Sequence, residues 1–172
     1  MKICIMITLR LVAGTFTEFD GERWGYDGGD PNENWKVVKS AGIVVIRGNS
    51  MLTITRGKNA FEFPKGRIEW GETYAMTAQR EFIEETGCVN IEDLQVNWQA
   101  TFVQEYDYIR KGRQTKKKVY LFFGVENPGR EMQFGKRERQ TLSLQWSSLW
   151  DVEKKYPGVS RAANLACEAL KF

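Results

Sequence analysis

The sequence predicts a single α/β domain in which helices pack against a mixed β-sheet. The chain has 172 residues, of which 42% are hydrophobic and 13% aromatic, so it is long enough and apolar enough to bury a core. Segments rich in Val, Ile and Phe recur along it, and further stretches have the composition of helices. No internal repeat, low-complexity segment or linker divides the chain.

The N-terminal segment is expected to add a strand and a loop to this domain. Residues 3–16 are apolar and strand-like, and residues 18–34 combine six acidic residues with several glycines, as a solvated loop or extended hairpin does. A cleaved signal peptide is the alternative for the first segment, but Arg10 interrupts its apolar run, which favours the strand. We therefore expect residues 1–35 to be an extension packed on the main domain, residues 36–172.

The central segment predicts three strands followed by a helix. The strands are supported by Val and Ile, and the helix by a stretch without Gly or Pro. The expected elements are a strand at 36–47, a turn at Gly48 and Asn49, a strand at 51–56, a short strand at 61–66 that Pro64 stops, and a helix at 73–86 that Gly87 ends in a left-handed conformation.

The C-terminal segment returns to strands and closes with helices. The expected elements are one long strand or two strands at 94–109, a strand at 118–126, a loop at 127–140, a strand at 141–146, a helix within 147–156 that begins at a serine cap, and an amphipathic helix at 160–171.

Composition excludes several classes of function. The net charge is only +3, so bulk charge does not indicate a nucleic-acid partner. The three cysteines are widely spaced and odd in number, which is typical of a reducing compartment, and we expect a cytoplasmic location. No apolar run approaches the ~20 residues that span a bilayer, so no membrane partner is expected. The absence of histidine excludes Ser-His-Asp triads and His-ligated zinc.

The most informative feature is a concentration of carboxylates on the helix expected at 73–86. Glu81 and Glu85 are four residues apart and Glu84 lies three residues beyond Glu81, so all three project from one side. Their repulsion costs roughly 0.2–0.5 kcal/mol per pair, which a solvated acidic face would tolerate. Apolar positions mark a buried side and place the acids at its edge: Ala75, Ala78 and Phe82. Oxygens gathered in this way suit Mg²⁺, which also keeps waters and shares positions with phosphates.

The residues around this helix carry the signature G-x5-E-x7-R-E-U-x-E-E-x-G-U, in which U is a bulky apolar residue. The matching positions are Gly66, Glu72, Arg80, Glu81, Phe82, Glu84, Glu85, Gly87 and Cys88. The sequence thus resembles the Nudix box of the Nudix hydrolases. The resemblance implies a Nudix-type α/β/α sandwich with a mixed β-sheet, and the order of strands extends it over roughly residues 36–170.

The resemblance implies hydrolysis of a pyrophosphate bond in a nucleoside diphosphate linked to another group X. Water attacks phosphorus in this family, assisted by Mg²⁺ or Mn²⁺, because a polyanionic substrate must be neutralised first. Glu81 and Glu85 are expected to ligate the metal together with the carbonyl of Gly66. Glu84 is expected to be a further ligand or the general base.

The general base and the role of Arg80 stay open at this point. The family takes its base from the signature or from a later loop, where Glu138 and Glu131 are candidates. Glu138 is preferred because it lies eight residues before Trp146, where many members place such a glutamate. Either acid could instead be an ordinary surface residue. Arg80 would hold a glutamate in orientation by a charge-assisted hydrogen bond, with Glu72 fixing the preceding loop, or the two could form a plain buttressing ion pair.

Residues outside the signature bear on the identity of X. Lys65 stands as in members acting on dinucleoside polyphosphates, diphosphoinositol polyphosphates and RNA 5′ ends, and would meet a phosphate. Tyr106 matches a tyrosine position of diadenosine polyphosphate hydrolases and would stack on adenine, or it is an ordinary strand residue. Trp70 stands where relatives often have proline and would add a stacking surface. Phe102 replaces the proline of ADP-ribose hydrolases.

Two basic segments follow the signature. Residues 110–118 hold six positive charges and no acid, and residues 134–139 resemble a basic stretch of diphosphoinositol hydrolases. Such segments are either solvated loops or surfaces that steer a polyphosphate or an RNA, in which case Lys116 and Lys118 are substrate contacts.

The leading expectation is Mg²⁺-dependent hydrolysis of diadenosine or related polyphosphates. The alternatives are an RNA 5′-end pyrophosphohydrolase or decapping enzyme, a diphosphoinositol polyphosphate hydrolase and, outside enzymes, a non-catalytic module that binds a nucleotide or RNA. Such modules usually lose the signature glutamates, and this chain keeps all of them. The oligomeric state and the number of metal ions are left open.

Overall fold

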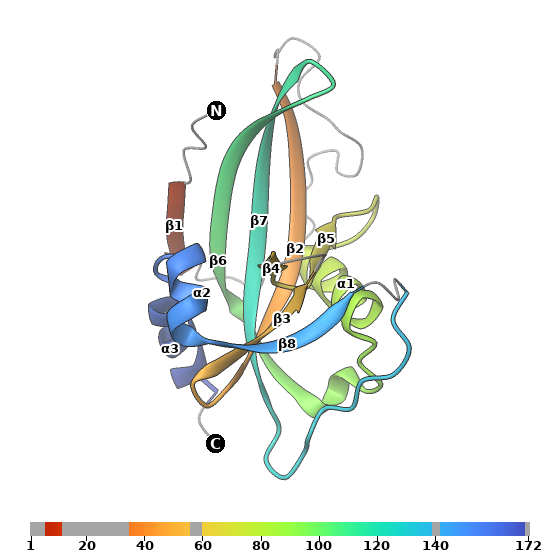
Figure 1. Ribbon diagram of the computed structural model, residues 1–172, viewed down its shortest axis with the longest axis vertical. Helices are drawn as coiled ribbons and strands as arrows, with labels where there is room; N and C mark the ends of the chain where they lie inside the picture. Colours follow the sequence, from red (N-terminus) through yellow and green to blue (C-terminus); the bar gives the residue numbers. More distant parts are fainter. Residues whose placement is uncertain (1–5, 12–34, 56–59, 139–141, 171–172) are drawn as a thin grey trace.

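The computed structural model describes residues 6–11, 35–55, 60–138 and 142–170 (Figure 1). Its strands are β1 (Met6–Leu11), β2 (Trp35–Arg47), β3 (Ser50–Thr55), β4 (Phe61–Glu62), β5 (Lys65–Arg67), β6 (Leu94–Arg110), β7 (Arg113–Glu126) and β8 (Ser143–Ser148). Its helices are α1 (Tyr74–Thr86), the short 3-10 helix η1 (Ile91–Asp93), α2 (Leu149–Lys155) and α3 (Val159–Glu168).

The described strands form one eight-stranded sheet in the order β1-β6-β7-β2-β3-β4, with β5 paired to β2 and β8 paired to β3. β2 and β7 run parallel, whereas the other pairings are antiparallel. The mixed sheet predicted from the sequence is confirmed.

Helices cover both faces of this sheet, because neighbouring residues of a strand point to opposite sides. Ile43 of β2 shares a core with Phe82 of α1. Val44, the next residue, shares a second core with Val152 of α2 and Ala162 of α3. The α/β/α sandwich is therefore confirmed, with α1 and the short η1 on one face and α2 and α3 on the other.

β6 and β7 form a long hairpin that includes residues 110–118, for which the sequence allows a solvated loop or a surface that steers the substrate. Lys111 (φ 49°) and Gly112 (φ 74°) make its two-residue turn, and both occupy the left-handed region, as a type I′ turn requires. β7 therefore begins at Arg113 instead of residue 118. Propensity rules did not predict this strand because lysine is unfavourable in strands, whereas here Lys116, Lys117 and Lys118 are each paired with a residue of β6.

Smaller differences affect other elements. The strand expected at 61–66 is divided into β4 and β5, because Pro64 cannot donate a ladder hydrogen bond. The segment 94–109 is one strand with a shift of register near Asn97. The serine cap of α2 is Ser148, and α3 lies within the range expected for the closing helix apart from its first residue.

β1 adds an edge strand that runs antiparallel to β6. It accounts for residues 6–11 of the strand expected at 3–16, and the loop expected at 18–34 lies outside the described residues. Within the described part of the chain, no helix is both long and apolar enough to cross a bilayer.

Candidate active site

The sequence of α1 fixes both of its ends. The hydroxyl of Thr73 accepts a hydrogen bond from the backbone N of Met76 at 3.1 Å, which caps the first turn. Gly87 ends the helix with φ 70°. A Cβ at Gly87 would lie only 2.5 Å from the carbonyl oxygen of Gly135, so glycine is also needed for the close approach of a neighbouring loop.

Two carboxylates of α1 converge on β5. The carboxylate of Glu81 lies directly over Gly66, because a Cβ added there would stand 1.8 Å from its Cδ and about as close to both oxygens. Glu85 is 7% exposed, and its Oε2 accepts a hydrogen bond from the backbone N of Lys65 at 2.9 Å. Both side chains therefore meet the same two-residue segment of the sheet.

Arg80 lies at the centre of the acidic cluster. Its Nη1 donates to Oε1 of Glu81 at 2.7 Å and to Oε2 of Glu84 at 3.3 Å. Its Nε and Nη2 donate to the two carboxylate oxygens of Glu72 at 2.6 and 3.0 Å, and Nη2 also reaches the carbonyl of Arg67 at 2.9 Å. One guanidinium thus connects β5, the loop before α1 and two glutamates of the helix.

Glu72 is held by more than this ion pair. Its Oε2 also accepts hydrogen bonds from the hydroxyl of Thr77 at 2.6 Å and from the backbone N of Glu69 at 3.0 Å. Partial burial opposes ionisation, but the hydrogen bonds from Arg80, Thr77 and Glu69 outweigh it and lower the pKa of Glu72 to about 2. Glu72 is therefore a fixed anion that shapes the loop.

Glu138, the preferred candidate for a downstream base, lies beside Glu84. Its backbone N donates to the carbonyl of Glu84 at 3.0 Å, and the two side chains share a hydrogen bond. Burial raises the pKa of Glu84, and the charges of Glu81 and Glu138 raise it further while Arg80 opposes them. Glu131 is exposed and interacts electrostatically with Arg47, away from this pair.

Backbone hydrogen bonds carry Glu138 to this position. Val89 N donates to Gln133 O at 2.9 Å, and Gly135 N donates to Gly87 O at 2.6 Å. The loop before β8 thus runs along the chain that leaves α1, which sequence spacing alone could not reveal.

The acidic cluster fits a divalent cation with few protein ligands. Within the described residues, no group of three or more His, Cys, Asp or Glu side chains is placed to hold a metal ion together. Glu81 lies over Gly66 and Glu85 accepts from the backbone N of Lys65, whereas Glu84 is directed to Arg80 and Glu138. Two carboxylates and one carbonyl suit Mg²⁺ or Mn²⁺, since such ions keep several waters and bind substrate phosphates. Metal ligation by Glu81, Glu84, Glu85 and the carbonyl of Gly66 stays a prediction.

The predicted substrate residues divide between the two faces of the sheet. Gly66 faces α1, so Lys65 faces the α2 and α3 side, where its Nζ lies 3.0 Å from Oε2 of Glu62. Tyr106 packs against the core on that same side. Burial, with the nearby Tyr108 and Glu62, raises the pKa of Tyr106 to about 12.

Tyr156 and Lys155 also lie on this face but were not among the site residues predicted from the sequence. Tyr156 is buried against Phe63, with ring centroids 4.7 Å apart. Lys155 donates to the carbonyl of Phe61, and burial lowers its pKa, as does the charge of Lys65. Lysine is common in the last turn of a helix, so its position in the sequence did not indicate that Lys155 belongs to this site.

Lys116 and Lys118 lie on the α1 side of β7. Their side chains point to the same face of the sheet as that of Tyr120, because alternate residues of a strand share a face. The ring centroid of Tyr120 lies 4.2 Å from that of Tyr74 in α1. The Nζ of Lys118 is 3.1 Å from Oε1 of Glu105. These lysines are therefore separated from Lys65 and Tyr106 by the sheet. Trp70, in the turn before α1, is 80% exposed.

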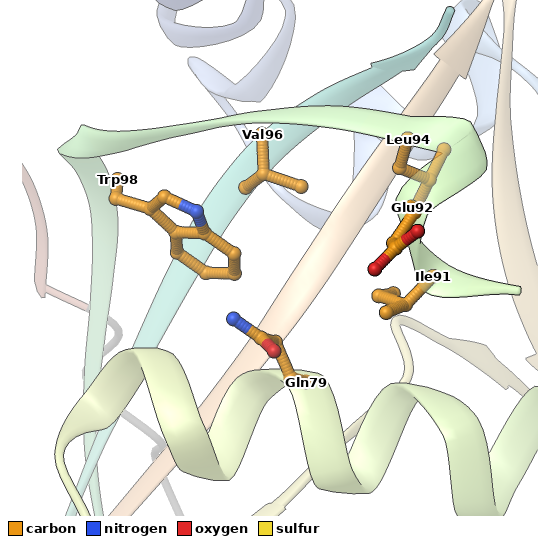
Figure 2. A pocket seen from close by; sticks show the side chains of 6 residues that line it. All are labelled: Gln79, Ile91, Glu92, Leu94, Val96 and Trp98. Carbon is orange, nitrogen blue, oxygen red and sulfur yellow. The ribbon is translucent and has the colours of Figure 1, made fainter.

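A pocket of about 200 Å³ lies between α1, η1 and β6, and Figure 2 shows its lining. Gln79 points from α1 toward Trp98, with Glu92 at the other end (Figure 2). At 100° per residue, Gln79 is rotated about 200° around the helix axis from Glu81 and about 240° from Glu85. The pocket therefore opens on the flank of α1 away from the carboxylates.

Comparisons with known proteins agree with this architecture. A family model described as the NUDIX domain matches residues 36–168. The Ap4A hydrolase of C. elegans, solved as a binary complex, is 23% identical with a TM-score of 0.50, over 77% of this chain and 96% of that chain. The MutT protein of Bacillus halodurans is 19% identical with a TM-score of 0.47, over 68% and 72% of the two chains. At 23% identity, the similarity to the C. elegans structure shows the fold alone. No curated protein sequence matches the chain.

Proposed function

The chain belongs to the Nudix family of hydrolases, which cleave pyrophosphate bonds, and from this premise we propose that its substrates are diadenosine or closely related dinucleoside polyphosphates. The observation that carries the proposal is the convergence of Glu81 and Glu85 on Lys65 and Gly66. The same short strand that meets the carboxylates on one face presents the Lys65 ammonium on the other, on the side of Tyr106.

Mg²⁺ or Mn²⁺ is the cofactor that this donor set suits, and Glu81, Glu85 and the carbonyl of Gly66 would hold it. When bound, such an ion neutralises phosphate oxygens and lowers the pKa of water. Glu84 and Glu138, whose side chains share a hydrogen bond, would accept the proton of the attacking water. Arg80 acts as a positioning residue, since its hydrogen bonds hold the glutamates in orientation.

The remaining residues would hold the substrate outside the reacting bond. Lys65 would neutralise a phosphate, Tyr106 would stack on an adenine, and the exposed ring of Trp70 offers a second stacking surface. Lys116 and Lys118 would act at longer range on the polyphosphate charge. We also propose a cytoplasmic location, which suits the unpaired cysteines Cys88 and Cys167.

A second candidate is an RNA 5′-end pyrophosphohydrolase, favoured by the basic β6–β7 hairpin. The two candidates are separated by incubating the protein and Mg²⁺ with diadenosine tetraphosphate, a diphosphoinositol polyphosphate and 5′-triphosphorylated RNA in parallel, with EDTA controls. We expect the fastest EDTA-sensitive hydrolysis of diadenosine tetraphosphate. Faster release from RNA or from the inositol substrate would select that alternative, and no release from any would indicate a binding module.

A further inference from the structure

We propose that the far end of the β6–β7 hairpin, with the adjoining part of β2, binds single-stranded RNA. This surface, the arm, comprises residues 35–39 and 105–118. Figure 1 shows these strands extending beyond the helices that cover the rest of the sheet. The choice of RNA rests partly on the second candidate function, hydrolysis at an RNA 5′ end, whereas the binding itself does not depend on any hydrolytic activity.

The positively charged residues of the arm lie on and at the end of a continuously paired hairpin. Residues 108–118 contain six lysines and arginines and no acid. The pairing of β6 with β7 is unbroken from Thr101 to the turn, and Arg110 and Arg113 form its last pair. Arg110, Lys111 and Arg113 are exposed, so three positive charges lie at the tip of the hairpin.

The length of the arm decides which polyanion can use it. Gly42 of β2 pairs with Lys65 on one side and with Leu121 on the other, whereas Trp35 pairs with Gln114 near the tip. These seven steps along β2 span about 23 Å at 3.3 Å per residue. Because the Debye length is about 8 Å at physiological ionic strength, the tip charges are screened from a small substrate bound at Gly66. Only a polymer long enough to reach from Gly66 to the tip would be bound more tightly because of the tip charges.

Aromatic rings between the cations indicate a nucleic acid strand. Tyr106 and Tyr108 lie on one face of β6, with ring centroids 6.0 Å apart. The Nζ of Lys117 lies 5.9 Å from the centroid of Tyr106. Rings in series beside a basic track are how proteins bind single strands, each ring stacking on one unpaired base. A double helix hides its base faces and would gain nothing from the tyrosines.

The position of the arm favours RNA among single strands. The arm leads away from the edge where Lys65 and Gly66 meet the glutamates. Transcripts keep the triphosphate of their first nucleotide, so an RNA with its 5′ end at this edge would have its following nucleotides directed along the tyrosines and on to the tip.

The test is binding of a 12-nucleotide single-stranded RNA with a 5′-hydroxyl, measured by fluorescence anisotropy at several salt concentrations. Such an RNA has no scissile bond, so binding is measured whether or not the protein hydrolyses any substrate. The tip variant is Arg110→Gln, Lys111→Asn and Arg113→Gln, in which asparagine tolerates the left-handed turn position. The matched control, Arg130→Gln, Lys154→Gln and Arg161→Gln, removes the same charge from exposed sites elsewhere.

We expect the tip variant to weaken binding about 10-fold or more and to lower the slope of log Kd against log salt by about 2, as the loss of three phosphate contacts would do. The control should change Kd less than about 2-fold. Tyr108→Ser should weaken binding and Tyr108→Phe should retain it, which tests stacking even if the tip variant does not fold. Equal losses in the tip and control variants, or equal affinity for the RNA annealed to its complement, would overturn the proposal.

Discussion

Arg80 holds Glu72 by two parallel hydrogen bonds, from Nε to Oε1 at 2.6 Å and from Nη2 to Oε2 at 3.0 Å. The third nitrogen of the same guanidinium donates to Glu81 at 2.7 Å. The side chain therefore ties the loop before α1 to a proposed metal ligand. This geometry uses the planar fork of arginine, which a lysine with the same charge cannot reproduce.

We expect Arg80→Lys to lower kcat about 10- to 100-fold, because a shift of the glutamates by a fraction of an ångström misplaces the reacting groups. The free energy of unfolding should fall by about 1–3 kcal/mol, as it does when other charged hydrogen bonds are lost. The measurements are steady-state kinetics and Tm, with Arg67→Lys as the control, because only the backbone of Arg67 contacts Arg80. An unchanged kcat would show that Arg80 is a structural tie alone.

Gly66 should tolerate no side chain. In Gly66→Ala the added Cβ would overlap the carboxylate of Glu81, so this carboxylate must leave its place over β5. We expect Mn²⁺ affinity to fall about 10-fold or more, measured by calorimetry without substrate. Gly135→Ala is the matched control, because its Cβ would meet Val89 at an ordinary 3.5 Å. Equal Mn²⁺ affinity in the two variants would place the metal elsewhere.

Glu138→Gln tests the downstream base. We expect kcat to fall about 100-fold, the usual effect of removing a general base, while the backbone bond to Glu84 preserves the loop. Glu131→Gln is the comparison, because this exposed acid belongs to the same loop but lies away from Glu84. If Glu131→Gln has the larger effect, or neither variant loses activity, the base must be another group.

Local sequence predicted α1 well and long-range geometry poorly. The helix, its cap at Gly87 and its glutamates follow from neighbouring residues, so a 23-residue signature contained them. The contact between Glu84 and Glu138 joins positions more than fifty residues apart and depends on the approach of Gly135 to Gly87. No local pattern encodes such an approach.

The secondary structure of the basic segment, residues 110–118, was not predicted from the sequence for a different reason. Six charges in nine residues predict a solvated loop, because strand propensity averages over surfaces on which lysine is unfavourable. Here Lys118 pairs with Glu105 across the hairpin, and Lys111 and Gly112 supply the turn. Pairing partners in another strand overrode the local preference.

Lys116 and Lys118 should assist capture of the substrate more than its turnover. We expect the double change to glutamine to raise KM about 3- to 10-fold with little effect on kcat, because the lysines lie along β7 beyond the reacting edge. The effect should shrink at high salt. Lys154→Gln with Arg161→Gln controls for net charge. A loss of kcat with unaltered KM would contradict this role.

Arg47 and Glu126 should make stability depend on acid pH. Arg47 donates to both oxygens of Glu126 at 3.0 and 2.6 Å, and Met132 N donates to Oε1 at 2.9 Å. The hydrogen bond from Arg47, aided by that of Met132, lowers the pKa of Glu126 despite burial. A carboxyl whose pKa is lower in the folded state adds stability above its unfolded pKa of about 4.3, and this stability is lost as pH falls through the folded value.

We therefore expect Glu126→Gln to lower the free energy of unfolding by about 1–2 kcal/mol at pH 7, since Arg47 is partly exposed and solvent weakens the pair. The difference from the unmodified protein should shrink below pH 4, where protonation removes the same charge. Chemical unfolding between pH 3 and pH 7 measures it, with Glu168→Gln, an exposed acid of α3, as control. A difference that is constant over this range would mean that Glu126 acts by packing and not by charge.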